Sequence, residues 1–154
     1  MMKLSIMIPA LLLAAAAQGA LAADAKPAPK AKTAVAPKTN FLDMSVDAVM
    51  DKATAIGVMR AGIPAKVWKL YPASKWVFVS QVEGGVTGGG ACVITARAML
   101  LPLTAGTKRP VLEPEKRATT FDMQAGANRD QCRELGKAKL KEALEAVVSS
   151  LIKT

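Results

Sequence analysis

Residues 75–103 constrain the fold of this chain more than any other stretch, because two apolar runs there flank a glycine-rich loop. The first run, residues 75–82, is apolar on both alternating faces, which is typical of a central strand. The second run, residues 92–101, places Cys92 and four apolar side chains on one face by the two-residue period of a strand. The pattern predicts a central β-hairpin.

The loop between the runs contains five glycines: Gly84, Gly85, Gly88, Gly89 and Gly90. Their spacing matches neither a phosphate loop, which needs a Gly-Lys-Ser/Thr ending, nor the G-x-G-x-x-G pattern of dinucleotide-binding folds. We interpret the loop as a flexible hairpin connection, since glycine permits the positive φ angles of tight turns. The alternative is a mobile loop that closes over a ligand or a partner.

Sequence patterns on both sides of the hairpin predict four more elements. Ser45 is a plausible N-cap for an amphipathic helix over residues 46–59, which ends at residues 61–64. Residues 66–71 contain β-branched and aromatic side chains before a Pro-containing turn, so they predict a strand paired with residues 75–82. Residues 116–123 predict an edge strand. An apolar stripe predicts a helix over residues 129–152.

This order of elements predicts one α+β domain over residues 41–154. Its expected parts are a helix, a four-stranded antiparallel meander and a C-terminal helix, with both helices packed on one face of the sheet. Cys92 and Cys132, the two cysteines of the chain, are expected to face the same helix–sheet interface. In an oxidising compartment this position predicts a disulfide between them.

The first 22 residues have the features of a secretory signal peptide: a basic start at Lys3, an apolar run, and small residues at a cleavage point after Ala22. The apolar run is too short to span a bilayer, which needs about 20 residues, so we expect no membrane anchor in the mature chain. Residues 23–40 are rich in Ala, Pro and Lys and predict a disordered linker. The expected location is a periplasm or the exterior of the cell.

Two groups of residues suggest contact with a partner. The net charge of +9 favours anionic surfaces, so the basic linker is a candidate arm for an anionic polymer or a lipid surface, and a simple spacer is the alternative. Aromatic and basic side chains lie close in sequence and form a candidate basic and aromatic patch: Lys66, Trp68, Lys69, Lys75 and Trp76. Core aromatics with outward lysines are the preferred interpretation.

No motif for catalysis or for cofactor or metal binding is recognisable. The chain contains no His, which is the commonest general base and metal ligand. We therefore expect a non-enzymatic binding module of the cell envelope that contacts a protein or an anionic polymer and has no cofactor. One alternative is an inhibitor or immunity protein that blocks an enzyme with the glycine loop. A third hypothesis is a small hydrolase that uses carboxylates such as Glu83 and Asp122.

Overall fold

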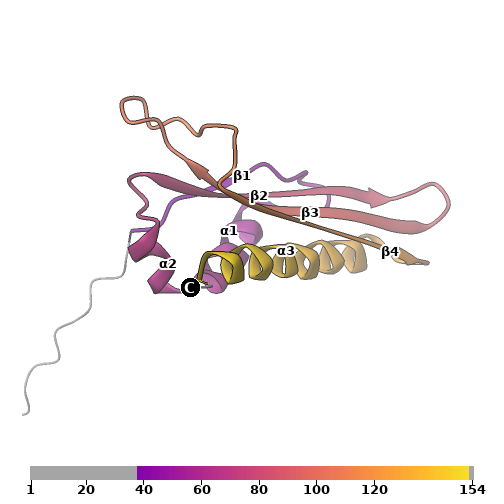
Figure 1. The fold of residues 1–154 in the computed structure, drawn as a ribbon. Coiled ribbons are helices and arrows are strands. Elements are labelled where there is room, and N and C mark those ends of the chain that lie inside the picture. The colour runs from indigo at the N-terminus through magenta and orange to yellow at the C-terminus, as the bar shows by residue number, and fades with distance from the viewer. Residues whose placement is uncertain (1–37, 153–154) are drawn as a thin grey trace, which may run out of the picture. The chain divides into compact units, whose positions relative to one another are not determined.

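A computed structural model describes residues 38–152 of the chain. The predicted signal peptide and most of the predicted linker lie outside these residues. The described part consists of one sheet with helices on one of its faces (Figure 1). The elements, in chain order, are β1 (Phe41–Asp43), α1 (Lys52–Gly62), α2 (Ala65–Leu70), β2 (Trp76–Val86), β3 (Ala91–Pro102), β4 (Lys116–Ala125) and α3 (Arg129–Ile152).

The sheet is mixed, with the strand order β1-β2-β3-β4. Strands β2, β3 and β4 form an antiparallel meander, as predicted, whereas β1 pairs with β2 in parallel. The prediction of a fully antiparallel sheet is therefore wrong. The strand that was not predicted is β1, which precedes α1. The chain between β1 and β2 forms both α1 and α2 before it returns to the sheet.

Residues 66–71 do not form the strand that was predicted, because the chain from Ala65 to Leu70 is helix α2. Pro64 occupies its N-cap position with φ −69°, and proline favours the start of a helix. Ala65, Lys66 and Leu70 are good helix formers. Val67 and Trp68 are both buried, so the aromatic and β-branched side chains that suggested a strand pack into the core from a helix instead.

Helix α1 starts later than predicted, at Lys52 rather than near residue 46. Its N-cap is Asp51, whose carboxylate accepts the Thr54 N–H at 2.9 Å and the Thr54 hydroxyl at 2.7 Å. Ser45, the predicted cap, instead accepts the Val82 N–H at 3.0 Å. The chain before α1 therefore continues along β2 beyond the end of β1, and the helix begins only after it leaves the sheet.

Helix α3 has the predicted bounds and covers β2, β3 and β4. All five residues of its predicted apolar stripe are buried: Leu140, Leu144, Val147, Val148 and Leu151. Gly62 lets α1 approach α3 closely, since a Cβ there would lie 2.6 Å from Leu144 Cδ2. The main core thus forms between the sheet and the helices. Among the described residues, no helix combines the length and apolarity needed to cross a membrane.

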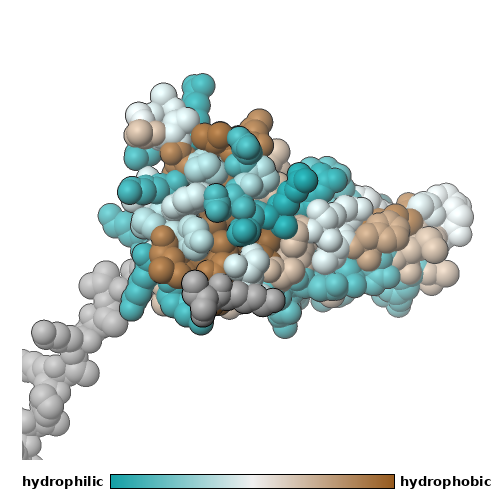
Figure 2. All heavy atoms as spheres, in the orientation of Figure 1, coloured by the Kyte–Doolittle hydropathy of each residue, from teal (hydrophilic) through white to brown (hydrophobic). Residues whose placement is uncertain are grey.

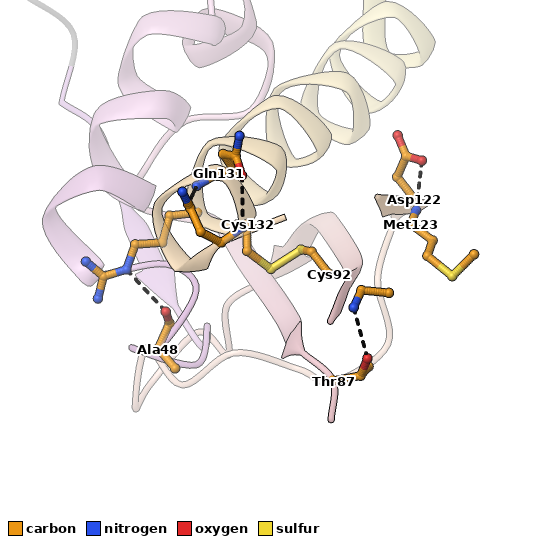
Figure 3. The surroundings of a disulfide bond; sticks show 10 residues. Ala48, Thr87, Cys92, Asp122, Met123, Gln131 and Cys132 are labelled. Carbon is orange, nitrogen blue, oxygen red and sulfur yellow. Dashed lines mark hydrogen bonds between the residues drawn. A yellow bond between two sulfur atoms is a disulfide. The ribbon is translucent and has the colours of Figure 1, made fainter. Parts of the chain in front are cut away.

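The predicted disulfide is confirmed between Cys92, in the second position of β3, and Cys132, in the first turn of α3 (Figure 3). Both residues are buried, and their Cα atoms are 5.5 Å apart. The bond links two residues 40 positions apart in sequence. It therefore fixes the start of α3 to the end of the sheet where the β2–β3 hairpin lies. Such a bond is typical of proteins in oxidising, extracytoplasmic compartments.

Candidate functional site

Strand β4 is the long open edge of the sheet. It pairs with β3 along its whole length, and no other strand of residues 38–152 pairs with its second side. The Gly126 N–H donates to the Gly90 carbonyl at 2.8 Å, so these two residues form a hydrogen-bonded pair next to the β3–β4 ladder. Hydrogen-bonded and non-hydrogen-bonded pairs alternate along an antiparallel ladder, so this bond identifies which β4 residues bond to β3. Even-numbered β4 residues bond to β3. The odd-numbered residues from Arg117 to Ala125 direct their N–H and C=O groups away from the sheet.

Two large apolar side chains accompany these outward backbone groups. Phe121 is 64% exposed and Met123 is 61% exposed. Their partners in the register are Thr95 and Val93, on the face of the sheet opposite the helices. The outward backbone of residues 117–125 together with the side chains of Phe121 and Met123 is called the edge surface below. An edge strand of this length, with exposed apolar side chains, is a template for pairing with another chain.

The remainder of this outer face is divided between a covered part and a polar part. Val77, Val79 and Leu101 are buried and form a small cluster with Met99 and Leu103. Leu103 begins the loop that leads to β4, and Figure 1 shows this loop on the side of the sheet away from α3. Next to this cluster, Arg97 and Glu83 are exposed and both contact Gln81. The edge surface is thus the uncovered apolar part at the side of β4.

The space-filling view shows apolar atoms at both ends of the sheet. In Figure 2, brown apolar atoms lie among teal hydrophilic ones at the end of the molecule opposite the hairpin and also toward the hairpin end, next to the pale atoms of its tip. Both Phe121 and Met123 lie in the half of β4 that runs toward that end. Isolated exposed apolar residues are ordinary on protein surfaces, but two on the same face of an unpaired edge form a contiguous contact area.

Asp122 occupies a special position on the edge. Its Oδ1 accepts the N–H of Met123 at 2.8 Å, and its Oδ2 lies 3.1 Å from Lys139 Nζ on α3. The Lys139 ammonium and then the Met123 N–H hold the pKa of the Asp122 carboxyl below its ordinary value of 3.8, since both stabilise the charged form. Glu142, 2.8 Å away, and then Asp122 raise the pKa of Lys139 above 10.5.

The structure places the five glycines of the hairpin in two settings. Gly84 and Gly85 belong to β2 and have φ angles of 125° and 152°. Gly88, Gly89 and Gly90 lie in the exposed turn between β2 and β3, where the Gly90 N–H donates to the Thr87 carbonyl. Gly84, Gly85 and Arg129 line a cavity of about 290 Å³ beside the disulfide. A partner-binding role for these glycines stays a prediction.

The residues of the predicted basic and aromatic patch do not form one stacking surface. Trp68 is 5% exposed and contacts Phe41 and Phe78 edge-to-face, with ring centroids 5.6 and 5.3 Å away. Trp76 is half-buried against Tyr71. Lys66 and Lys69 are exposed on α2, and Lys75 is exposed before β2. The lysines are available to an anionic partner, but Trp68 is not available to stack on a base or a sugar.

The described residues assemble neither the candidate pair of acid–base carboxylates nor a metal site. Glu83 lies opposite Thr95 on the outer face, whereas Asp122 lies opposite Ile94, whose side chain is buried beneath the helices. The two carboxylates are therefore on opposite faces of the sheet and two strands apart. Within residues 38–152, no group of three or more Cys, Asp or Glu side chains is arranged to hold a metal ion.

A groove of about 750 Å³ runs between α1 and α3 on their solvent side. Small side chains form much of its floor, among them Gly57, Ala61 and Ala138. Lys137 and Lys141 lie at its rim, and each pairs with an acidic residue of α3, at 3.5 Å and 3.8 Å. The charges at this rim therefore balance one another and select no class of ligand.

Comparisons with known proteins leave the family of this chain undefined. No protein-family model and no curated protein matches it. A PelC dodecamer from Paraburkholderia phytofirmans resembles it with a TM-score of 0.39 and 10% identity, over 72% of this chain and 88% of that chain. A proposed lipoprotein from Caulobacter crescentus CB15 gives 0.32 and 6%, over 72% and 83%. Scores this low define neither the fold nor the function of this chain.

The sequence did not reveal Phe121 and Met123 as site residues. The edge position of residues 116–123 is confirmed, and the two-residue period places Phe121 and Met123 on the same face. That period was the available signal. The sequence pattern does not show which face of β4 the helices cover. In the structure they cover the face of Thr120 and leave the other face of β4 open.

Proposed function

We propose that this protein is a non-enzymatic binding module of the cell envelope that holds a protein partner along the edge surface. The observation that carries the proposal is the open edge of β4 with exposed Phe121 and Met123. A strand added to such an edge gains main-chain hydrogen bonds, while the side chains beside it contribute apolar contact. The disulfide supports a location outside the cytoplasm.

Charge near the edge favours a partner with acidic groups. Lys116 and Arg117 are exposed at the start of β4, and the single acidic residue of this strand is Asp122, which already pairs with Lys139. The N-terminal segment adds further lysines, at Lys26, Lys30, Lys32 and Lys38. We assign to it a supporting contact with an anionic envelope polymer or lipid surface, whose strength falls with salt.

The proposal is tested by comparing two serine variants in co-purification from envelope extracts at low salt. Phe121→Ser removes the aromatic side chain from the edge surface and should reduce recovery of the partner by about tenfold, since aromatic side chains carry much of the energy of an interface. Leu112→Ser is the matched control, because Leu112 is 84% exposed on the loop before β4 and lies off the edge. It should recover the partner as the wild type does.

Two results count against the proposal. One is recovery of no partner by the wild-type chain. The other is equal recovery with Phe121→Ser and Leu112→Ser, which would place the contact elsewhere. Circular dichroism of both variants separates lost binding from lost folding, and an exposed position should tolerate either substitution.

A further inference from the structure

We propose that the partner along β4 is a second copy of this chain, paired antiparallel about a two-fold axis at Thr119. This inference rests on the proposed function, because it names the occupant of the same edge. A strand that pairs with its own copy forms an isologous interface, in which each contact occurs twice. The possible centres on this edge, from Arg117 to Phe121, differ in backbone availability and in charge, and the structure distinguishes them.

Backbone availability limits the pairing to the first half of β4. Only odd-numbered residues direct N–H and C=O groups outward, so odd-numbered residues of one copy must pair with odd-numbered residues of the other. The outward N–H of Met123 is already bonded to Asp122 Oδ1 (Figure 3). Arg117, Thr119 and Phe121 thus remain for a partner. With the axis at Thr119, these residues form about six hydrogen bonds between the copies.

The side chains also match in this register. On the helix side, Lys116 of one copy lies opposite Asp122 of the other. Asp122 can accept this ammonium while it retains Met123 and Lys139, because a carboxylate has about four acceptor sites. On the outer face, Arg117 lies opposite Phe121 of the second copy, which suits a cation–π contact. Thr119 of one copy lies opposite Thr119 of the other.

The neighbouring registers are worse. An axis at Arg117 would place the Arg117 side chains of the two copies directly opposite each other, and like charges in opposed positions destabilise a strand pair. An axis at Phe121 would require the Met123 N–H, which Asp122 already occupies, and would move Lys116 away from Asp122. An axis at Ala118 or Thr120 also pairs odd-numbered residues, but it places Lys116 opposite Thr120 or Gln124 of the other copy rather than opposite Asp122. Among these registers, the axis at Thr119 satisfies the free backbone groups and the charges together.

The interface is small, since it consists of residues 116–122 from each copy. It belongs to the class of weak and reversible contacts that bury less than about 1,200 Å². We therefore expect a monomer–dimer equilibrium that depends on concentration rather than a permanent dimer.

Cysteine cross-linking tests the register directly. Residues that face each other in a hydrogen-bonded antiparallel pair have Cα atoms about 5.5 Å apart, within the range that a disulfide spans. Thr119→Cys should therefore form a covalent dimer when the full chain is oxidised with diamide. The two native cysteines are already paired, so they do not compete. In the control Arg117→Cys, the two Cα atoms would be about 15 Å apart, so the thiols should not cross-link.

A sedimentation series on the full chain tests the edge without new thiols. Thr119→Pro removes an outward N–H, which an edge strand tolerates, and should raise the dimer dissociation constant at least about tenfold because two hydrogen bonds are lost per dimer. Ala125→Pro is the matched control, since it also removes an outward N–H but lies outside the paired residues. Its constant should stay within about twofold of the wild type.

The possible outcomes separate this inference from the proposed function. A wild type that stays monomeric, or equal cross-linking of Thr119→Cys and Arg117→Cys, overturns the second copy as occupant. If the wild type is monomeric and co-purifies with a different protein, and Thr119→Pro no longer recovers that protein, the proposed function stands with a foreign strand on β4. If all variants retain that protein, the edge is not the binding site and both conclusions are overturned.

Discussion

Asp122 and Lys139 form a salt bridge, with Oδ2 3.1 Å from Nζ, that joins the edge strand β4 to helix α3. The same carboxylate accepts the Met123 N–H through its other oxygen. One side chain therefore both attaches the edge to the helix and removes one backbone donor from it. This arrangement leaves the first half of β4 open and closes part of the second half.

Replacing Asp122 by alanine should release the Met123 N–H. We expect the Met123 amide to exchange with solvent faster, while the free energy of unfolding falls by less than about 1 kcal/mol because the Asp122 side chain is 43% exposed. Hydrogen exchange by NMR measures the first effect and urea denaturation the second. The control Glu142→Gln removes the other partner of Lys139 and should leave Met123 unchanged. Unchanged exchange in Asp122→Ala would contradict this role.

The pH dependence of the edge follows from the lowered pKa of Asp122. Its folded-state pKa lies below the ordinary 3.8, so its contribution to stability is fully present above pH 3.8 and is lost as pH falls through the lowered value. A carboxyl ¹³C titration by NMR should therefore give a midpoint below 3.8. Lys139→Met should raise this midpoint, because the ammonium is the larger cause. A wild-type midpoint at or above 3.8 would show that the salt bridge is not formed in solution.

Loss of the disulfide should destabilise the fold without changing its topology. In the chain-entropy model, closing a loop between residues 40 positions apart contributes about 4 kcal/mol. We expect the double variant Cys92→Ala/Cys132→Ala to lose a similar amount in urea denaturation. Reduction of the wild type is the control and should give the same loss. A difference below about 1 kcal/mol would mean that the unfolded chain is already restricted there.

Two glycines should respond in opposite ways to alanine. At Gly84, a Cβ would lie 1.9 Å from the Val93 carbonyl oxygen, and φ is 125°, so Gly84→Ala should cost more than about 2 kcal/mol. At Gly57, in the middle of α1, a Cβ meets nothing within 4 Å, so Gly57→Ala should stabilise the protein by about 0.5–1 kcal/mol. Thermal unfolding measures both. Equal effects of the two substitutions would refute this assignment.

Ser80 should contribute to stability through one buried hydrogen bond. It is fully buried, and its hydroxyl donates to Asp43 Oδ1 at 2.7 Å, linking β2 to β1. Ser80→Ala should cost about 1–3 kcal/mol, because the bond involves a charged acceptor. Ser149→Ala, at an exposed position of α3, is the control and should change stability by less than about 0.5 kcal/mol. Equal losses in a denaturant titration would remove the special role of Ser80.

Sequence patterns predicted the elements whose signal is local. The bounds of α3, the β2–β3 hairpin and the edge position of β4 agree with the structure, because an apolar stripe or a two-residue alternation determines each of them. The disulfide followed from the same patterns. Each of these elements buries one face, so the spacing of its apolar residues contains most of the information.

The errors arose where the determining contacts are distant in sequence. Phe41 pairs with Phe78, and no pattern within a three-residue strand indicates a parallel partner so far along the chain. Trp68 suggested a strand, although it packs between Phe41 and Phe78 from a helix. The edge surface was missed for a related reason. Whether Phe121 is buried or exposed depends on which face the helices cover, which is a property of the whole fold.

The disulfide also determines what a protease could do to this protein. Cys92 and Cys132 enclose the whole of β4 and the loop before it, where Leu112 is the most exposed large apolar residue of the described chain. A cut in that loop would leave two polypeptide pieces still joined through the two sulfur atoms. In an environment rich in secreted proteases, such a nicked molecule would keep its mass and its edge strand until a reductant separated the pieces.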